Sequence, residues 1–143
     1  MRTLPQYWVC PECGRKFAKE GQGHVHGTWT AEEHLEDRPV ASLRIYERFL
    51  EALSELGPFE LAPTKAQIGF QTKRIFAGVH LTERGLEGYL DLAREVESSR
   101  FNHVSPYTKR LWVHHFVLTS ADDLDEEFAG WLSEAYEVGW GVR

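Results

Sequence analysis

The sequence predicts an α+β fold: an N-terminal zinc knuckle, then a helix, an antiparallel β-sheet of about four strands, and a C-terminal helix. Three observations predict it. Two cysteines lie three positions apart near the N-terminus, apolar residues recur at helical spacing after residue 39, and apolar and polar residues then alternate through the middle of the chain. A chain of 143 residues is long enough to build one such domain.

The first segment, from residue 1 to about residue 37, has glycines at short intervals and no helical period, which indicates turns. The helical period that follows is carried by Leu43, Tyr46, Leu50 and Leu53. Because residues three and four positions apart share one face of a helix, we predict a helix over residues 39–56. Asp37 is its expected N-cap, and Gly57 followed by Pro58 is its expected stop.

The middle of the chain changes to a period of two, which is typical of antiparallel strands with one buried face. The alternation predicts strands over residues 66–71, 74–81, 86–92 and 110–118. In the second of these, one face is expected to carry Ile75, Ala77, Val79 and Leu81, and the other Arg74, Phe76, Gly78 and His80. Residues 93–109 are polar and contain Ser105-Pro106, so we expect a long connection there.

The last predicted element is a helix that begins at Ser120 and ends at Gly139. Its buried stripe is expected to consist of Leu124, Phe128, Trp131, Leu132 and Ala135. Acidic residues crowd positions 122–127, where their negative charges complement the positive end of a helix dipole. This electrostatic explanation accounts for the acidic run better than a metal cluster does.

The two cysteines belong to a candidate zinc site. Cys10 and Cys13 lie in a CPECG turn, and ten residues separate Cys13 from His24, with His26 two positions further on. Two thiolates and two imidazoles form a donor set that Zn²⁺ prefers, and four protein ligands leave no open coordination position, so we expect a structural zinc. His34 is the reserve ligand if His26 points away. A redox dithiol and a pair of unbonded structural cysteines are the alternatives.

A second candidate site lies on the predicted sheet, on the face away from the aliphatic residues. The residues expected to bind an anionic or aromatic ligand there are Lys65, Arg74, Phe76, Tyr89, His103 and His115. His114 and His115 are neighbours on one strand, so only one of them can face this site. In the alternative interpretation the cations are solvated or ion-paired, and one histidine is a core residue.

The charge distribution limits the partners. The net charge is −6, and residues 119–143 hold 7 acidic and 1 basic side chains, whereas residues 60–118 hold 8 basic and 6 acidic ones. An acidic chain disfavours non-specific nucleic-acid binding, although the middle segment can still hold an anion. No apolar run approaches the roughly 18 residues of a membrane span, and two close cysteines make no disulfide framework. We therefore expect a cytoplasmic protein without a membrane partner.

Several motifs resemble one family. They are the run from Trp8 to Ala18, Gly27-x-Trp29-Thr30, Pro63-Thr64-Lys65, Arg74-x-Phe76-Ala77-Gly78-Val79, His114-His115-Phe116 and Ser120-x-Asp122-Asp123-Leu124-Asp125. Together they resemble a group of small bacterial proteins catalogued only as a domain of unknown function, some labelled as predicted transport proteins. The resemblance implies the zinc knuckle and an uncharacterised α+β domain, and it implies no activity. The family usually has cysteine where His26 stands.

We therefore expect a zinc-knuckle segment over residues 1–36 and an α+β domain of unknown function over residues 37–143. The expected function is a non-enzymatic zinc-binding module with an anion- or ligand-binding sheet face. Its expected partners are a small anionic ligand, a nucleic acid or another protein. The alternatives are an enzyme acting on an anionic or nucleotide-like substrate, and a nucleic-acid-binding protein that uses the sheet face. The chain has no G-x-S-x-G motif, no phosphate-binding loop and no third cysteine, which disfavours the common enzyme classes.

Overall fold

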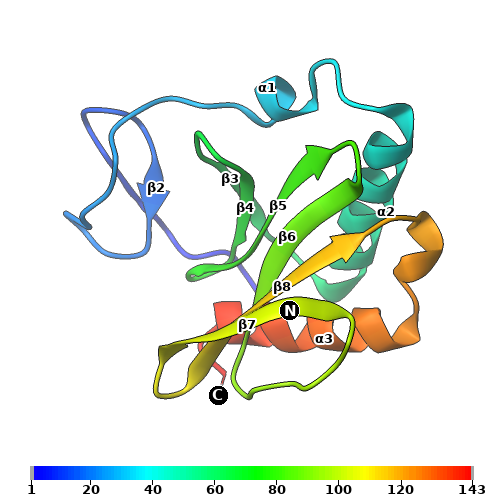
Figure 1. Ribbon diagram of the computed structural model, residues 1–143. Helices are drawn as coiled ribbons and strands as arrows, with labels where there is room; N and C mark the ends of the chain where they lie inside the picture. The colour runs from blue at the N-terminus through cyan, green and yellow to red at the C-terminus, as the bar shows by residue number, and fades with distance from the viewer. Residues whose placement is uncertain (1, 143) are drawn as a thin grey trace.

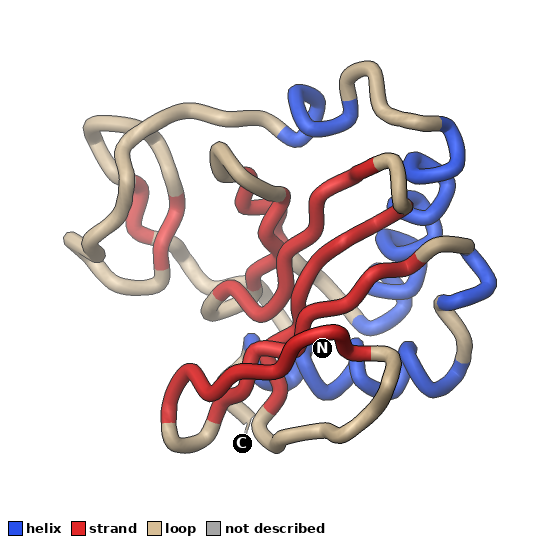
Figure 2. The backbone as a smooth tube through the Cα atoms, in the orientation of Figure 1, coloured by secondary structure: helices blue, strands red, loops and turns tan. Residues whose placement is uncertain are grey.

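A computed structural model describes residues 2–142 as a six-stranded antiparallel sheet, a separate two-stranded hairpin and three α-helices (Figures 1 and 2). The α+β fold class is thereby confirmed. None of the helices within these residues combines the length and apolar character that crossing a membrane requires.

The helices are α1 (Ala31–Leu35), α2 (Val40–Leu56) and α3 (Glu126–Gly139), and a short 3₁₀ turn, η1 (Ala121–Asp123), precedes α3. The hairpin consists of β1 (Trp8–Val9) and β2 (Lys16–Phe17). The sheet contains β3 (Glu60–Pro63), β4 (Ile68–Gln71), β5 (Ile75–Thr82), β6 (Gly85–Leu92), β7 (Phe101–Thr108) and β8 (Leu111–Leu118). Its strand order is β3-β4-β5-β6-β8-β7, and every neighbouring pair is antiparallel.

The prediction of about four strands was too low, because it omitted β3 and β7. These two strands are the edges of the sheet. An edge strand leaves one row of backbone groups unpaired and tolerates proline, and β3 ends at Pro63 while β7 contains Pro106. The residues of β7 are mostly exposed, so no apolar alternation marks them. The long connection expected over residues 93–109 is therefore wrong from Phe101 onward.

The two long helices cover one face of the sheet and leave the other face open. α2 and α3 pack on β5 and β6 and against each other (Figure 1). The core lies in this layer, and among its fully buried side chains are Phe49, Phe70, Phe116, Phe128 and Leu132. The hairpin lies at the opposite side of the sheet from the helices, beside the open face (Figure 2). This arrangement leaves room for a site between the hairpin and the sheet.

The predicted first helix is present over nearly the predicted range, but its start and its buried face differ in detail. Pro39 is the N-cap of α2, whereas Asp37 has a left-handed backbone with φ of 54° and does not cap it. Gly57 ends the helix as expected. Tyr46 and Leu53 are buried as predicted, and Ile45 and Phe49 are buried beside them. The expected stripe members Leu43 and Leu50 lie half-buried at the margin of the core.

The predicted last helix divides into two elements. The Ser120 hydroxyl accepts a hydrogen bond from the backbone N–H of Asp122 and caps the short η1, and Asp125 caps α3 by accepting from the N–H of Phe128 at 3.0 Å. Glu126 and Glu127 occupy the first turn of α3, as dipole electrostatics predicts. All five predicted stripe residues are buried, so the inward face of this segment is confirmed.

A β-bulge in β5 overturns the predicted placement of Phe76. Phe70 pairs with Ala77 and Gln71 pairs with Ile75, so Phe76 is the extra residue between two ladder positions. The bulge turns Phe76 toward the helices, where it is fully buried and its ring lies 5.7 Å from that of Tyr136. Ile75 turns to the open face in exchange. Strict alternation cannot anticipate this exchange, because an extra residue reverses the register on one side of the bulge.

Candidate metal centre and adjoining cleft

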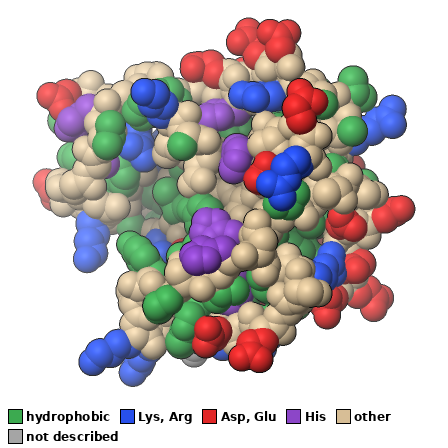
Figure 3. All heavy atoms as spheres, viewed as in Figure 1, with side chains coloured by type: hydrophobic (Ala, Val, Ile, Leu, Met, Phe, Trp, Pro, Cys, Tyr) green, Lys and Arg blue, Asp and Glu red, His purple; other side chains and the backbone are tan. Residues whose placement is uncertain are grey.

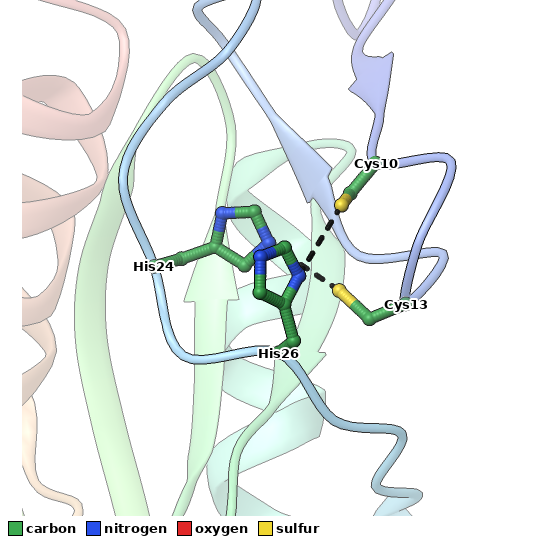
Figure 4. A group of neighbouring side chains, drawn as sticks. All are labelled: Cys10, Cys13, His24 and His26. Atoms are coloured by element: carbon green, nitrogen blue, oxygen red, sulfur yellow. Dashed lines mark hydrogen bonds between the residues drawn. The ribbon is translucent and has the colours of Figure 1, made fainter.

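The hairpin holds the two cysteines in a tight turn. Cys10 follows β1 and Cys13 precedes β2. The turn is closed by two backbone hydrogen bonds, from the N–H of Cys10 to the carbonyl of Arg15 at 2.9 Å and from the N–H of Gly14 to the carbonyl of Cys10 at 2.8 Å. Gly14 has φ of +78°, a left-handed conformation that glycine adopts without strain. This backbone directs both sulfur atoms to the same side (Figure 4).

The loop after β2 brings two histidines back to the cysteines. Figure 4 shows the imidazoles of His24 and His26 facing the sulfurs of Cys10 and Cys13. The four ligand atoms all lie within 4.8 Å of one another. We call these four residues the Cys–His cluster. Within residues 2–142 it is the one group of cysteine, histidine and acidic side chains with the geometry to hold a metal ion.

The sulfur-to-nitrogen distances in this cluster match those of a zinc tetrahedron. Cys10 Sγ lies 3.5 Å from His26 Nδ1, and Cys13 Sγ lies 3.3 Å from His24 Nε2. With Zn–S bonds of about 2.3 Å and Zn–N bonds of about 2.0 Å, tetrahedral angles place a sulfur and a nitrogen ligand about 3.5 Å apart. The cluster therefore needs little rearrangement to coordinate an ion.

The second nitrogen of each imidazole is held by a partner outside the cluster. His24 Nδ1–H donates to the backbone carbonyl of Gln22 at 2.6 Å, and His26 Nε2 lies 2.7 Å from a carboxylate oxygen of Glu12. A proton on the outer nitrogen leaves the inner nitrogen with a bare lone pair directed at the sulfurs. Metal-binding histidines in proteins are oriented in this way by carbonyls and carboxylates.

The electrostatics at Cys13 favour the thiolate. Burial opposes ionisation, but backbone hydrogen bonds at Arg15 and Gly27, together with the side-chain contacts to His26 and His24, outweigh it and lower the pKa of the Cys13 thiol to about 6. The thiolate is the form of cysteine that ligates metals. Cys10 is buried and Cys13 half-buried, whereas His26 is exposed. The cluster thus lies at the surface with its Cys10 side inward.

Phe17 joins the Cys–His cluster to the rest of the molecule. Its ring is buried, lies 4.2 Å from the His24 ring and 6.3 Å from the Trp8 ring, and closes the cluster on its inner side. Three contacts tie the hairpin region to the sheet: Lys16 pairs with Glu60 at 2.6 Å, Gln71 donates to the Lys16 carbonyl at 3.4 Å, and Tyr7 donates to the Thr72 carbonyl at 2.5 Å.

The reserve ligand His34 lies elsewhere. Its Nε2 is 2.6 Å from the backbone carbonyl of Thr64, and it lines a separate hollow together with Lys65 and His80. The structure thus brings His26, not His34, to the cysteines. A redox dithiol is typically found at the N-terminus of a helix, whereas the Cys10–Cys13 turn joins two strands.

A cleft of about 710 Å³ lies between the knuckle segment and the open face of the sheet. Phe17, Ala18 and Gln22 form one wall, and the floor includes Ile75, Tyr89, Val113 and His115. Figure 3 shows a hollow at this place, with apolar side chains in its depth and histidines beside it. Pockets of 300–1,000 Å³ are typical of small-molecule sites.

Polar groups line one side of the cleft. Arg74 Nη2 donates to Asp91 Oδ2 at 2.8 Å, and the Asp91 side chain is only 7% exposed. Gln67 Nε2 lies 3.5 Å from the Tyr89 hydroxyl. Burial, reinforced by the negative charge of Asp91, raises the pKa of Tyr89 to about 12, so its hydroxyl is neutral. Burial and then the neighbouring His103 lower the pKa of His115, which favours the neutral imidazole.

The structure brings together three of the six residues expected on the sheet face: Arg74, Tyr89 and His115 all line the cleft. His103 lies beside them, with its ring 5.6 Å from that of His115. Phe76 is in the core, and Lys65 lines the separate hollow with His34 and His80, so neither belongs to this group. The sequence could not place these two, because their positions depend on the bulge in β5 and on the path of the loop before β4.

The adjacent histidines point to opposite faces, as strand geometry requires. His114 is fully buried, its Nδ1–H donates to the Trp112 carbonyl at 2.9 Å, and its Nε2 accepts from the backbone N–H of Val96 at 3.0 Å. Burial lowers the pKa of His114, in keeping with a neutral core histidine. His115 is therefore the member of the pair that faces the cleft.

Sequence reasoning missed several contributors: Glu12 at the metal centre, and Phe17, Gln67, Lys73, Asp91 and Tyr107 around the cleft. Glu12 occupies the variable position of the CPECG turn, which is a signal that could have been used. Asp91 lies on the open face of β6 together with Tyr89, as alternation along residues 86–92 indicates. The ion pair between Asp91 and Arg74 could not be predicted from the sequence, because the position of Arg74 relative to β6 depends on the bulge in β5.

The model of the family described as a domain of unknown function, DUF5655, matches residues 31–139. No curated protein and no solved structure matches the chain. The matched range contains the sheet and its three helices, whereas the Cys–His cluster precedes it. Because the match spans well over half of the sequence, the chain belongs to the DUF5655 family of uncharacterised domains.

Proposed function

We propose that this protein is a zinc-dependent binding module, in which the Cys–His cluster holds one structural zinc ion and keeps the knuckle segment in place over the sheet. The observation that carries the proposal is the orientation of both imidazoles. The outer nitrogen of each imidazole is held by Gln22 or Glu12. The inner nitrogen faces a cysteine sulfur at the distance that separates two ligands of a tetrahedral zinc ion.

The donor set argues for zinc and for a structural role. Two thiolates and two imidazoles suit a tetrahedral d¹⁰ ion, whereas hard cations such as Mg²⁺ and Ca²⁺ prefer oxygen ligands. Four protein ligands complete the shell and leave no position for a substrate or a reactive water. The zinc would instead supply the stability that a short hairpin and its loop lack, since two-residue strands bury little apolar surface.

The lining of the cleft supports the binding of a ligand. Its buried carboxylate, Asp91, forms an ion pair with Arg74 through Oδ2, so the two charges largely offset each other in the cleft. Tyr89 and His115 line the floor as neutral, ring-bearing groups. Such a surface holds a ligand by shape, stacking and hydrogen bonds.

The proposal is tested by metal analysis of protein purified without a polyhistidine tag. We expect about one zinc per chain, and visible d–d absorption of tetrahedral coordination after exchange with Co²⁺. Substitution of a residue that only hydrogen-bonds a zinc ligand typically lowers the affinity for zinc by roughly 10–100-fold. His26→Ala and Cys13→Ser each remove a ligand itself, so both should lower the affinity for zinc by more than this.

His34→Ala is the matched control, because His34 lies in the separate hollow. It should leave zinc affinity unchanged. Wild-type protein that carries no zinc above trace levels and binds none in titration would refute the proposal. Equal losses from His34→Ala and His26→Ala would refute the ligand set.

A further inference from the structure

The cleft is built from two parts of the chain that the Cys–His cluster holds together. The sheet contributes the floor, and Phe17, Ala18 and Gln22 contribute the wall opposite. Phe17 contacts His24 of the cluster and also lines the cleft. A movement of the Cys–His cluster would therefore shift the cleft wall directly, because the Phe17 ring contacts both.

The cleft offers flat, ring-bearing surfaces and amide groups. Tyr89 and His115 lie side by side on β6 and β8, where they are directly paired, with their ring centroids 6.2 Å apart. Tyr107 is 67% exposed at the mouth of the cleft, and its ring is free to pack on an incoming ligand. Gln67 adds an amide that both donates and accepts hydrogen bonds, and the buried Gln71 lies beside it in the lining. This combination recognises a planar heteroaromatic ring by stacking and by its polar edge.

The cleft also carries an excess of one positive charge. Asp91 offsets Arg74, and the exposed Lys73 lies at the same side without a second carboxylate among the cleft-lining residues. An anionic group on the ligand would be attracted to Lys73, and the outer guanidinium face of Arg74, which is 32% exposed, would strengthen the attraction. A cationic ligand would meet net repulsion there.

We propose that the cleft binds a small planar aromatic or heteroaromatic molecule that bears one anionic group, a phosphate or a carboxylate, and that zinc at the Cys–His cluster is required for tight binding. The ring lies over Tyr89 and His115, and the anion faces Lys73 and Arg74. The zinc requirement rests on the proposed function, whereas the ligand class rests on the cleft alone. By linkage, the ligand in turn raises the affinity for zinc by the same factor.

Calorimetric titration of the zinc-loaded protein tests the ligand class. The probes are AMP and nicotinate, which carry a ring with a phosphate or a carboxylate, and adenosine and ribose 5-phosphate, which each lack one half. We expect AMP or nicotinate to bind at least about tenfold more tightly than either half-probe, and the probe that binds identifies the anion. The proposal would be overturned if neither AMP nor nicotinate bound. It would also be overturned if adenosine or ribose 5-phosphate bound as tightly as AMP or nicotinate.

Substitutions at two exposed positions locate the site without disturbing the core. Lys73→Glu should weaken the binding of the anionic probe by about fivefold to tenfold, because it reverses an exposed charge near the anion. Tyr107→Ala should weaken it by about tenfold through lost stacking, and Tyr107→Phe should restore it.

Lys65→Glu is the control for charge, since Lys65 is exposed but lines the separate hollow. It should change affinity little. A loss with Lys65→Glu but none with Lys73→Glu would place the ligand elsewhere and overturn the assignment.

A parallel titration after chelation separates the two proposals, with zinc content measured on the same samples. Protein that holds one zinc but binds neither probe refutes the ligand class and leaves the metal site standing. Protein that binds a probe equally well with and without its zinc refutes the coupling alone. Protein that binds a probe but never acquires zinc refutes the metal site while supporting the ligand class.

Discussion

Outer hydrogen bonds, rather than the ligands themselves, distinguish the Cys–His cluster from a chance meeting of polar side chains. A histidine beside a cysteine at the surface is common, but here both imidazoles have their outer nitrogens occupied. The acceptor at Gln22 is a backbone carbonyl, which any residue at that position would supply. The acceptor at Glu12 is a side-chain carboxylate, which a substitution can remove. Glu12 is therefore the residue at which orientation can be tested separately from ligation.

Glu12→Ala is expected to lower zinc affinity by about tenfold, the low end of outer-shell effects, because the Glu12 side chain is 69% exposed. Glu12→Gln should recover most of the loss, since its amide oxygen can still accept from His26. Zinc competition with a chromophoric chelator measures both. Glu20→Ala, which removes an exposed carboxylate from the loop after β2, is the control and should have no effect. A full loss of zinc in Glu12→Ala would indicate that the carboxylate itself is a ligand.

Helices and strands with a long periodic pattern were predicted correctly from the sequence. The edge strands and the β-bulge were not. α2, β6, β8 and the stripe of α3 agree closely with the periodic pattern, because each faces a continuous core on one side. The edge strands β3 and β7 have no such requirement. The bulge in β5 follows from how β4 and β5 pair, and pairing is a property of two strands rather than of one sequence window.

The end of α2 offers a test of backbone conformation. Gly57 has φ of +145°, a region accessible essentially to glycine, and a Cβ added there would lie 2.5 Å from the Tyr136 hydroxyl, which donates to the Pro58 carbonyl at 2.8 Å. Gly57→Ala should therefore lower the free energy of unfolding by at least about 1–3 kcal/mol, as measured by urea denaturation.

Gly130→Ala is its matched counterpart. Gly130 lies in the interior of α3 and is exposed, and a methyl group added there would have no neighbouring atom within 4 Å. The substitution should raise the free energy of unfolding by about 0.5–1 kcal/mol, the usual gain of alanine over glycine in a helix. Destabilisation by both substitutions would show that α3 is constrained by more than its helical backbone.

On the scale of the whole molecule, the knuckle segment and the sheet domain have different sources of stability. The sheet domain has a continuous aromatic and aliphatic core between sheet and helices. The hairpin region has Phe17, Cys10 and a few polar contacts to the sheet. The family match begins at residue 31, after the hairpin and its loop. The domain boundary predicted between residues 36 and 37 stays a prediction.

Removal of zinc by a chelator should therefore loosen the knuckle segment and leave the sheet domain folded. Limited proteolysis is expected to cut first within residues 2–30 and to leave a resistant fragment that contains residues 31–139, and added zinc should restore protection. Mass spectrometry of the fragments locates the cuts. Simultaneous cleavage throughout the sheet would show that the metal is needed for the whole fold.

The sequence by itself determined the fold class, the two long helices, the central strands and the four residues of the candidate metal centre. These features are local or periodic: ligand spacing in a turn, apolar repeats along a helix, and alternation along a strand. The tertiary structure alone decided the edge strands, the inward turn of Phe76, the separation of Lys65 from Arg74, and the cleft. Each of these depends on which segments pair and where the hairpin lies against the sheet, and no single window of residues contains that information.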